Sequence, residues 1–295
     1  MFTMLKNLLI DITSKLKSWV ISRFCNFWGW VIGKFVMPSQ VIFQNNADSS
    51  GDPNRLYARE KGSENPDILV FYMTGNGATI APGQFDEVEM LQRSLSNTTL
   101  PSYRLIAFDP PGVNNATTIC SQSQIIDGSY NFIMGKMFKY HAANSNKKVI
   151  LVGWSLGGAT MVQVAQRLQN NGHSVQCLAD RSFTNITAVL EAKLRLSPDH
   201  RGRILFKSVV STILANTFGE MNAGAAALNM ARGSLHTMRL SDPLSDSVID
   251  SEASLSNAVS EEFHHVIPIQ PCQGRSGHQI AAHAHVADAI EKMCA

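Results

Sequence analysis

Short, mostly apolar runs alternate with longer amphipathic stretches over most of the chain. Short apolar runs are typical of strands buried on both faces of a parallel sheet, whereas apolar residues three and four positions apart are typical of helices. The pattern predicts strands at 55–60, 68–73, 103–108, 149–152, 175–179, 235–240 and 263–269. It predicts helices at 85–95, 127–140, 159–168, 188–196, 205–217, 223–231 and 278–290. Strands that alternate with helices predict an α/β fold, with a mostly parallel central sheet flanked by helices.

Residues 1–40 have a different pattern and are predicted to form an amphipathic helical arm. Their apolar side chains recur at helical spacing opposite a basic polar face, and three of the chain's 4 tryptophans lie there. Such a helix fits a membrane interface, so residues 1–36 are predicted to bind a membrane surface. The alternatives are an arm packed on protein and a true membrane span. A span is disfavoured because Arg23 and Lys34 bracket only about ten uncharged residues, where a bilayer needs roughly twenty.

The same segment bears on where the protein is expected to act. Lys6 and Asp11 interrupt any early apolar core, so no secretory signal peptide is predicted. The expected location is therefore the cytoplasm or the periphery of a membrane. Residues 41–295 are predicted to form one large domain.

The composition narrows the classes of function. A chain of 295 residues that is 44% hydrophobic and 16% charged can bury a large core. The net charge of +2 gives no basic excess, so no nucleic-acid partner is expected. The 5 cysteines are widely separated and contain no Cys-x-x-Cys pair, which indicates reduced thiols rather than a metal site.

One motif stands between a predicted strand and a predicted helix: Gly153-x-Ser155-x-Gly157. A strand that reverses directly into a helix forces its middle residue into a strained backbone conformation. Packing at such a turn leaves no room for side chains two positions to either side, which favours glycine there. The turn is typical of a nucleophile elbow, which would hold the Ser155 hydroxyl at the carboxyl edge of the sheet.

Three further motifs occur along the chain, one before the elbow and two after it. A Gly-rich turn at 74–78 precedes it, and an Asp246-Ser-Val-Ile turn and the pair Gly277-His278 follow it. Together they resemble the α/β hydrolase superfamily across residues 55–295. The resemblance implies an α/β-hydrolase fold for the catalytic domain, with residues 184–234 as a helical cap or lid, or as ordinary helices that cover the sheet.

A serine hydroxyl needs a general base, and the base needs an acid that orients it. The resemblance implies a catalytic triad of Ser155, Asp246 and His278, with Asp242 as the alternative acid. The other histidines are expected elsewhere, His264 and His265 in a strand and His283 and His285 on the surface of the last helix.

The resemblance implies no metal and no organic cofactor. It also implies an oxyanion hole and assigns two structural features. The main-chain amide of Leu156, at a helix N-terminus, and that of Asn76 would hold the oxyanion, with Gly77 as the alternative to Asn76. Asp109 is expected to be structural. The Arg181-Ser-Phe turn is similar to a turn in several lipid-active hydrolases.

These features imply a serine esterase or lipase-like enzyme that cleaves carboxylic (acyl) esters, with lipid-like substrates, through an acyl-serine intermediate. Two alternatives stay open at the level of the sequence. The chain could be a hydrolase-fold binding protein without turnover, or an acyltransferase that uses an acceptor other than water.

Overall fold

The computed structural model describes the residues 58–75, 80, 86–109, 122–142, 146–193, 221–241, 246, 249, 251–259, 264–269 and 283–295. The N-terminal arm predicted for residues 1–40 lies outside this set, as does the predicted helix at 205–217. Among the described helices, none has both the length and the apolar character needed to cross a bilayer.

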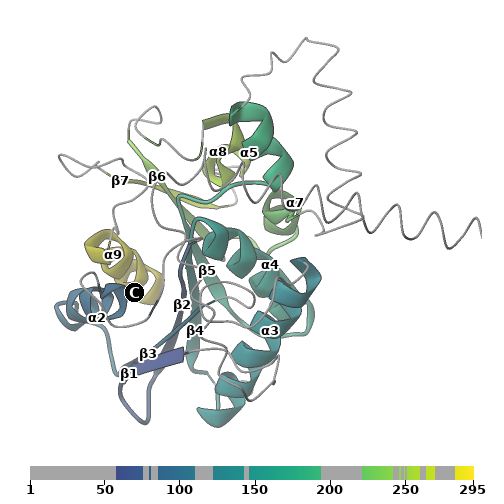
Figure 1. Ribbon diagram of the computed structural model, residues 1–295. Helices are drawn as coiled ribbons and strands as arrows, with labels where there is room; N and C mark the ends of the chain where they lie inside the picture. Colours follow the sequence, from purple (N-terminus) through teal and green to yellow (C-terminus); the bar gives the residue numbers. More distant parts are fainter. Residues whose placement is uncertain are drawn as a thin grey trace, which may run out of the picture. The chain divides into compact units, whose positions relative to one another are not determined.

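The described residues form a seven-stranded sheet with the order β1-β3-β2-β4-β5-β6-β7 (Figure 1). Neighbouring strands from β3 to β7 run parallel, and β1 pairs antiparallel with β3 at the edge. Since parallel strands share one carboxyl edge, the turns that follow them meet there. The strands are β1 (Ala58–Gly62), β2 (Ile68–Met73), β3 (Tyr103–Phe108), β4 (Lys148–Trp154), β5 (Gln176–Asp180), β6 (Leu235–Leu240) and β7 (His265–Ile269).

Helices cover both faces of this sheet, as expected for parallel strands that are buried on both sides. α2 and α9 pack together on one face, and α3 and α4 pack together on the other (Figure 1). β2 is apolar and buried throughout because each face meets one of these layers. The helices are α2 (Glu87–Ser96), α3 (Gln122–Lys139), α4 (Leu156–Asn170), α5 (Ile186–Lys193), α7 (Ala223–Leu228), α8 (Leu255–Ala258) and α9 (His283–Cys294), with a 3₁₀ turn, η3, at Ser251–Ala253.

The predicted order of elements is confirmed, and the differences lie at the boundaries. The strands predicted at 68–73, 103–108 and 235–240 have the predicted bounds. α3 begins at Gln122, five positions before the predicted start, because Gln122 to Gln124 are compatible with a helix although they carry no apolar periodicity. His264, predicted in a strand, precedes β7 and is buried, with its Nε2 3.1 Å from the Ala227 carbonyl oxygen.

Two helices of the predicted cap, α5 and α7, lie within the described residues between β5 and β6. α7 packs on α4, and α5 packs on η3. Asn222 is the N-cap of α7. Its side chain accepts a hydrogen bond from the Ala225 amide and so fixes where α7 begins. These two helices therefore cover the α4 layer and the turn after β6, while 194–220 lie outside the described residues.

Candidate active site

Ser155 occupies the turn between β4 and α4, at the carboxyl edge of the sheet. Its backbone has φ 54° and ψ −116°, a conformation that residues other than glycine rarely adopt. The Ser155 amide donates a 2.9 Å hydrogen bond to the main-chain carbonyl of Asp180, at the end of β5. The neighbouring strand thus supports a backbone whose strain is on the order of 1–3 kcal/mol.

Two glycines make this turn sterically possible. A Cβ atom on Gly153 would lie 2.3 Å from the main-chain carbonyl carbon of Gly157. A Cβ atom on Gly157 would lie 2.4 Å from the carbonyl oxygen of Met73, at the end of β2. The spacing of the Gly-x-Ser-x-Gly motif therefore reflects contacts between backbones, as the sequence predicts.

The loop that follows β2 passes against the serine. A Cβ atom on Gly75 would lie 3.1 Å from Ser155 Cβ and 3.2 Å from the Trp154 carbonyl oxygen. Leu156 is the first residue of α4, as predicted, so its amide belongs to the positive end of the helix dipole. Asn76, the other predicted oxyanion donor, and Gly77 lie outside the described residues.

The carboxylate of Asp109 connects the loops that follow β2 and β3. Its Oδ1 accepts hydrogen bonds from Thr74 Oγ1 at 3.1 Å and from the Ile80 amide at 3.2 Å, and the residue is fully buried. These bonds fix the start of the loop that reaches Ser155, which agrees with the structural role expected for Asp109.

Asp246 follows β6 and so lies at the same edge of the sheet as Ser155. It is half-buried, and its Oδ1 accepts a 2.8 Å hydrogen bond from the Ile249 amide. This bond holds one oxygen of the Asp246 carboxylate against the backbone. His278, the predicted base, and Asp242, the alternative acid, lie outside the described residues.

A group of buried polar side chains adjoins this edge, and the sequence analysis did not single it out. Tyr72 Oη donates a 3.0 Å hydrogen bond to Glu87 Oε2, in the first turn of α2. Burial raises the pKa of Glu87 to about 7, although the bond from Tyr72 and the charge of Arg181 oppose this rise. Beside them, Arg181 forms an ion pair with Asp180. The signal in the sequence is an Asp-Arg pair directly after an apolar strand, where charge is costly.

His283 was expected on the surface of the last helix, and this expectation is wrong. It is the first residue of α9 and is only 6% exposed, and neither ring nitrogen has a hydrogen-bond partner among the residues that the structure describes. The apolar face of α9 packs on the sheet, and His283 lies three positions before Val286 on that face. Burial lowers the pKa of His283 to about 4, with the charge of Asp180 opposing the change. His285 is exposed, as expected.

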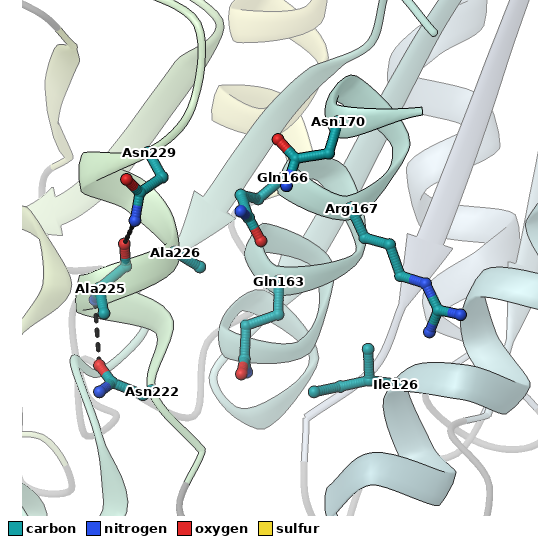
Figure 2. Close-up of a pocket in the computed structure, with 9 residues that line it drawn as sticks. All are labelled: Ile126, Gln163, Gln166, Arg167, Asn170, Asn222, Ala225, Ala226 and Asn229. Atoms are coloured by element: carbon teal, nitrogen blue, oxygen red, sulfur yellow. Dashed lines mark hydrogen bonds between the residues drawn. The ribbon is translucent and has the colours of Figure 1, made fainter. Parts of the chain in front are cut away.

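A pocket of about 390 Å³ lies on a different side of α4, between α3 and α7 (Figure 2). Its α4 residues begin at Gln163, about 12 Å along the helix axis from Ser155. Two of its amide side chains serve α7 itself, because Asn222 accepts from the Ala225 amide and Asn229 donates to the Ala225 carbonyl. The pocket is therefore separate from the elbow. Its lining consists of Ile126, Gln163, Gln166, Arg167, Asn170, Asn222, Ala225, Ala226 and Asn229.

The chain is similar to known proteins in two ways. The family model described as alpha/beta hydrolase fold matches residues 74–182, from the loop after β2 to the turn after β5. This interval contains Gly75, the elbow and the Asp180–Arg181 pair. No curated protein matches the sequence.

Solved structures share the fold at low sequence identity. A lipase-esterase related protein from Clostridium acetobutylicum is 15% identical with a TM-score of 0.52, over 80% of this chain and 98% of that one. Est1E from Butyrivibrio proteoclasticus is 10% identical with a TM-score of 0.51, over 81% of this chain and 93% of that one. The strained serine turn, the sheet order and the family model agree, and the chain has the α/β-hydrolase fold.

Proposed function

We propose that this chain is a serine hydrolase that cleaves carboxylic esters through an acyl-serine intermediate. The observation that carries the proposal is the strained backbone of Ser155 at the carboxyl edge of the sheet, with Gly75 packed against it. Strain of this kind is retained at functional sites, where the surrounding structure compensates for it. The motifs that resemble the superfamily assign the remaining roles.

In the proposed reaction, His278 removes the proton from Ser155 as the hydroxyl oxygen attacks the ester carbonyl. The amides of Leu156 and Asn76 stabilise the negative oxygen of the tetrahedral intermediate, each contributing roughly 10²-fold or more to kcat. His278 then protonates the leaving alcohol and afterwards activates water, which releases the acid from Ser155. Asp246 orients His278 and stabilises its positive charge.

Lipid-like substrates are favoured over small soluble esters. Residues 1–36 are proposed to bind a membrane surface, which would bring the enzyme to esters that reside in the bilayer. The name of one fold neighbour, a lipase-esterase related protein, is consistent with this class of substrate. Transfer of the acyl group to an acceptor other than water would use the same intermediate, and product analysis with added alcohol distinguishes it from hydrolysis.

The experiment that tests the proposal is labelling with a fluorophosphonate probe together with turnover of a short p-nitrophenyl ester. Wild type should be labelled and should turn the ester over, and Ser155→Ala should do neither. The matched control is Ser96→Ala, at an exposed position in α2, which should behave as wild type. A folded wild type that takes no label, or a Ser155→Ala variant labelled as strongly as wild type, would exclude the serine mechanism.

A further inference from the structure

Arg181 forms a buried ion pair with its own neighbour, Asp180. Arg181 Nε donates to Asp180 Oδ1 at 2.8 Å and Nη2 donates to Oδ2 at 2.6 Å, and the two side chains are 1% and 4% exposed. Arg181 also has φ 43°, which is rare outside glycine. A buried ion pair on a strained backbone seldom adds net stability. The pair is therefore better explained by what its charge does at this place.

The pair lies between the elbow and the turn that contains Asp246. The carbonyl of Asp180 accepts the Ser155 amide at 2.9 Å, and the amide of Arg181 donates to the Met238 carbonyl in β6 at 3.0 Å. The guanidinium carbon lies 5.8 Å from the centre of the Trp154 ring, next to Ser155. Residues 180 and 181 thus connect the strand before the nucleophile to the strand before the proposed acid.

Several titratable groups on different elements interact electrostatically with the guanidinium. They are Tyr72 on β2, Glu87 on α2, Asp180 on β5, Asp246 after β6 and His283 on α9. Burial alone would lower the pKa of Arg181, but the charge and hydrogen bonds of Asp180 and the charge of Asp246 raise it. The guanidinium therefore remains charged and attracts the carboxylate of Asp246.

We infer that Arg181 is a positioning residue of the proposed triad, and that its guanidinium, held by Asp180, keeps the Asp246 carboxylate ionised and in place. The inference rests on the proposed function. Arg181 acts through Asp246 and does not touch the substrate. Asp180 contributes by fixing the guanidinium with a planar, two-bond contact that a lysine ammonium could not reproduce.

The position of the charge leads to two opposite effects on the pH profile. A cation near the site disfavours protonation of both the acid and the base, since it repels an added proton. Removal of the cation in Arg181→Met should therefore move the acid limb of kcat/KM to higher pH, by about one unit. Asp180→Asn removes the negative charge that partly neutralises the Arg181 guanidinium. The net positive charge near the site then increases, so the acid limb of kcat/KM should move to lower pH.

The test is the pH profile of kcat/KM for a short p-nitrophenyl ester, with folding checked by circular dichroism. Arg181→Lys keeps the charge without the two-bond contact, so it should lose activity but retain the wild-type limb. Arg93→Met removes an equal charge from an exposed position on α2 and should leave the profile unchanged. Because the pKa of Glu87, about 7, lies in the same range, the Arg181→Met comparison is repeated in a Glu87→Gln background.

The outcomes separate the inference from the proposed function. If Arg181→Met does not fold, the test uses Asp180→Asn and Arg181→Lys. The inference is overturned if the acid limb of kcat/KM in Asp180→Asn stays at the wild-type pH. Equal losses of kcat/KM at every pH in Arg181→Met and Asp180→Asn also overturn it, because they indicate a structural role alone. Failure of the proposed function appears differently, as a wild type that neither turns over the ester nor takes the probe, and the inference falls with it.

Discussion

Gly75 lies so close to Ser155 at the carboxyl edge of the sheet that a side chain at residue 75 would crowd the serine, although the two are far apart in the sequence. A Cβ atom on Gly75 would approach Ser155 Cβ to 3.1 Å and the Trp154 ring to 3.3 Å. Few real Cβ contacts are so short, so a side chain at residue 75 would force the loop after β2 or the nucleophile to shift. The loop proposed to supply an oxyanion donor thus depends on this glycine.

Gly75→Ala should therefore impair catalysis much more than folding. The added methyl group displaces either the loop or the Ser155 side chain by a few tenths of an ångström. Misalignment on this scale is expected to lower kcat by about 10- to 100-fold. The measurement is ester turnover with the melting temperature as a check on stability.

The matched control for this substitution is Gly135→Ala, in α3. No atom lies within 4 Å of a Cβ atom at that position, and alanine favours a helix by about 1 kcal/mol over glycine. Gly135→Ala should therefore raise the melting temperature and leave kcat unchanged. If Gly75→Ala retains wild-type kcat, the loop does not depend on the glycine and its role in the site is wrong.

Glu87 predicts a pH dependence of stability. Its pKa is raised from 4.5 to about 7 in the folded protein, so the folded state binds this proton more tightly than the unfolded state. The contribution to stability is therefore present below pH 4.5 and is lost as the pH rises through about 7. Its size is on the order of 3 kcal/mol at most. Glu87→Gln should lack this loss, so the variant gains free energy of unfolding relative to wild type between pH 5 and pH 8.

Tyr72→Phe provides the companion variant for Glu87. The Tyr72 hydroxyl stabilises the ionised carboxylate, so its removal should raise the pKa of Glu87 further and extend the loss of stability to higher pH. Chemical denaturation at a series of pH values measures both variants. Parallel curves for wild type and Glu87→Gln would show that Glu87 does not titrate in this range.

The elements that could be predicted from the sequence are those with a strong local signal. β2 and the elbow depend on short-range patterns: an apolar run, and glycines two positions either side of Ser155. The mostly parallel sheet follows from the alternation of strands and helices, whereas the order of the strands in it does not. Boundaries were less accurate where polar residues begin a helix, as at Gln122 in α3.

The buried charges could not be predicted in this way, because no local pattern records them. Tyr72 lies in an apolar strand and Glu87 in the first turn of a helix, and only the fold brings them within hydrogen-bonding distance. Arg181 and Asp246 are likewise far apart in the sequence, and only the fold brings their charges close enough to interact. His283 was misjudged because histidine is usually found at helix surfaces, whereas here its position on the helix faces the core.

The contrast between His278 and His283 predicts the identity of the base. His278→Ala should lower kcat by about 10³-fold or more, as expected when the base of a triad is removed. His283→Leu removes a buried ring whose two nitrogens have no hydrogen-bond partner within the described part of the chain, so it should be neutral or stabilising and should change kcat only a few-fold. Turnover and thermal melting measure both variants.

His264→Leu is the matched control for this pair, because His264 is also buried but does have a partner in the Ala227 carbonyl. It should be destabilised by about 1–3 kcal/mol, since the carbonyl loses its bond, and kcat of the folded protein should remain near wild type. If His283→Leu abolishes turnover while His278→Ala retains it, the base has been assigned to the wrong histidine.

The N-terminal arm predicts a separation between membrane binding and chemistry. Deletion of residues 1–40 should abolish co-sedimentation with liposomes that contain anionic lipid, because the deleted segment carries the Trp-rich apolar face and its basic flank. Turnover of a soluble ester should persist, since the proposed catalytic residues lie beyond residue 40. Replacing Trp19, Trp28 and Trp30 with alanine in the full chain is the finer variant and should weaken binding without altering the charge. Unchanged co-sedimentation after the deletion would assign the arm to packing on protein, and loss of soluble-ester turnover would assign it to the stability of the catalytic domain.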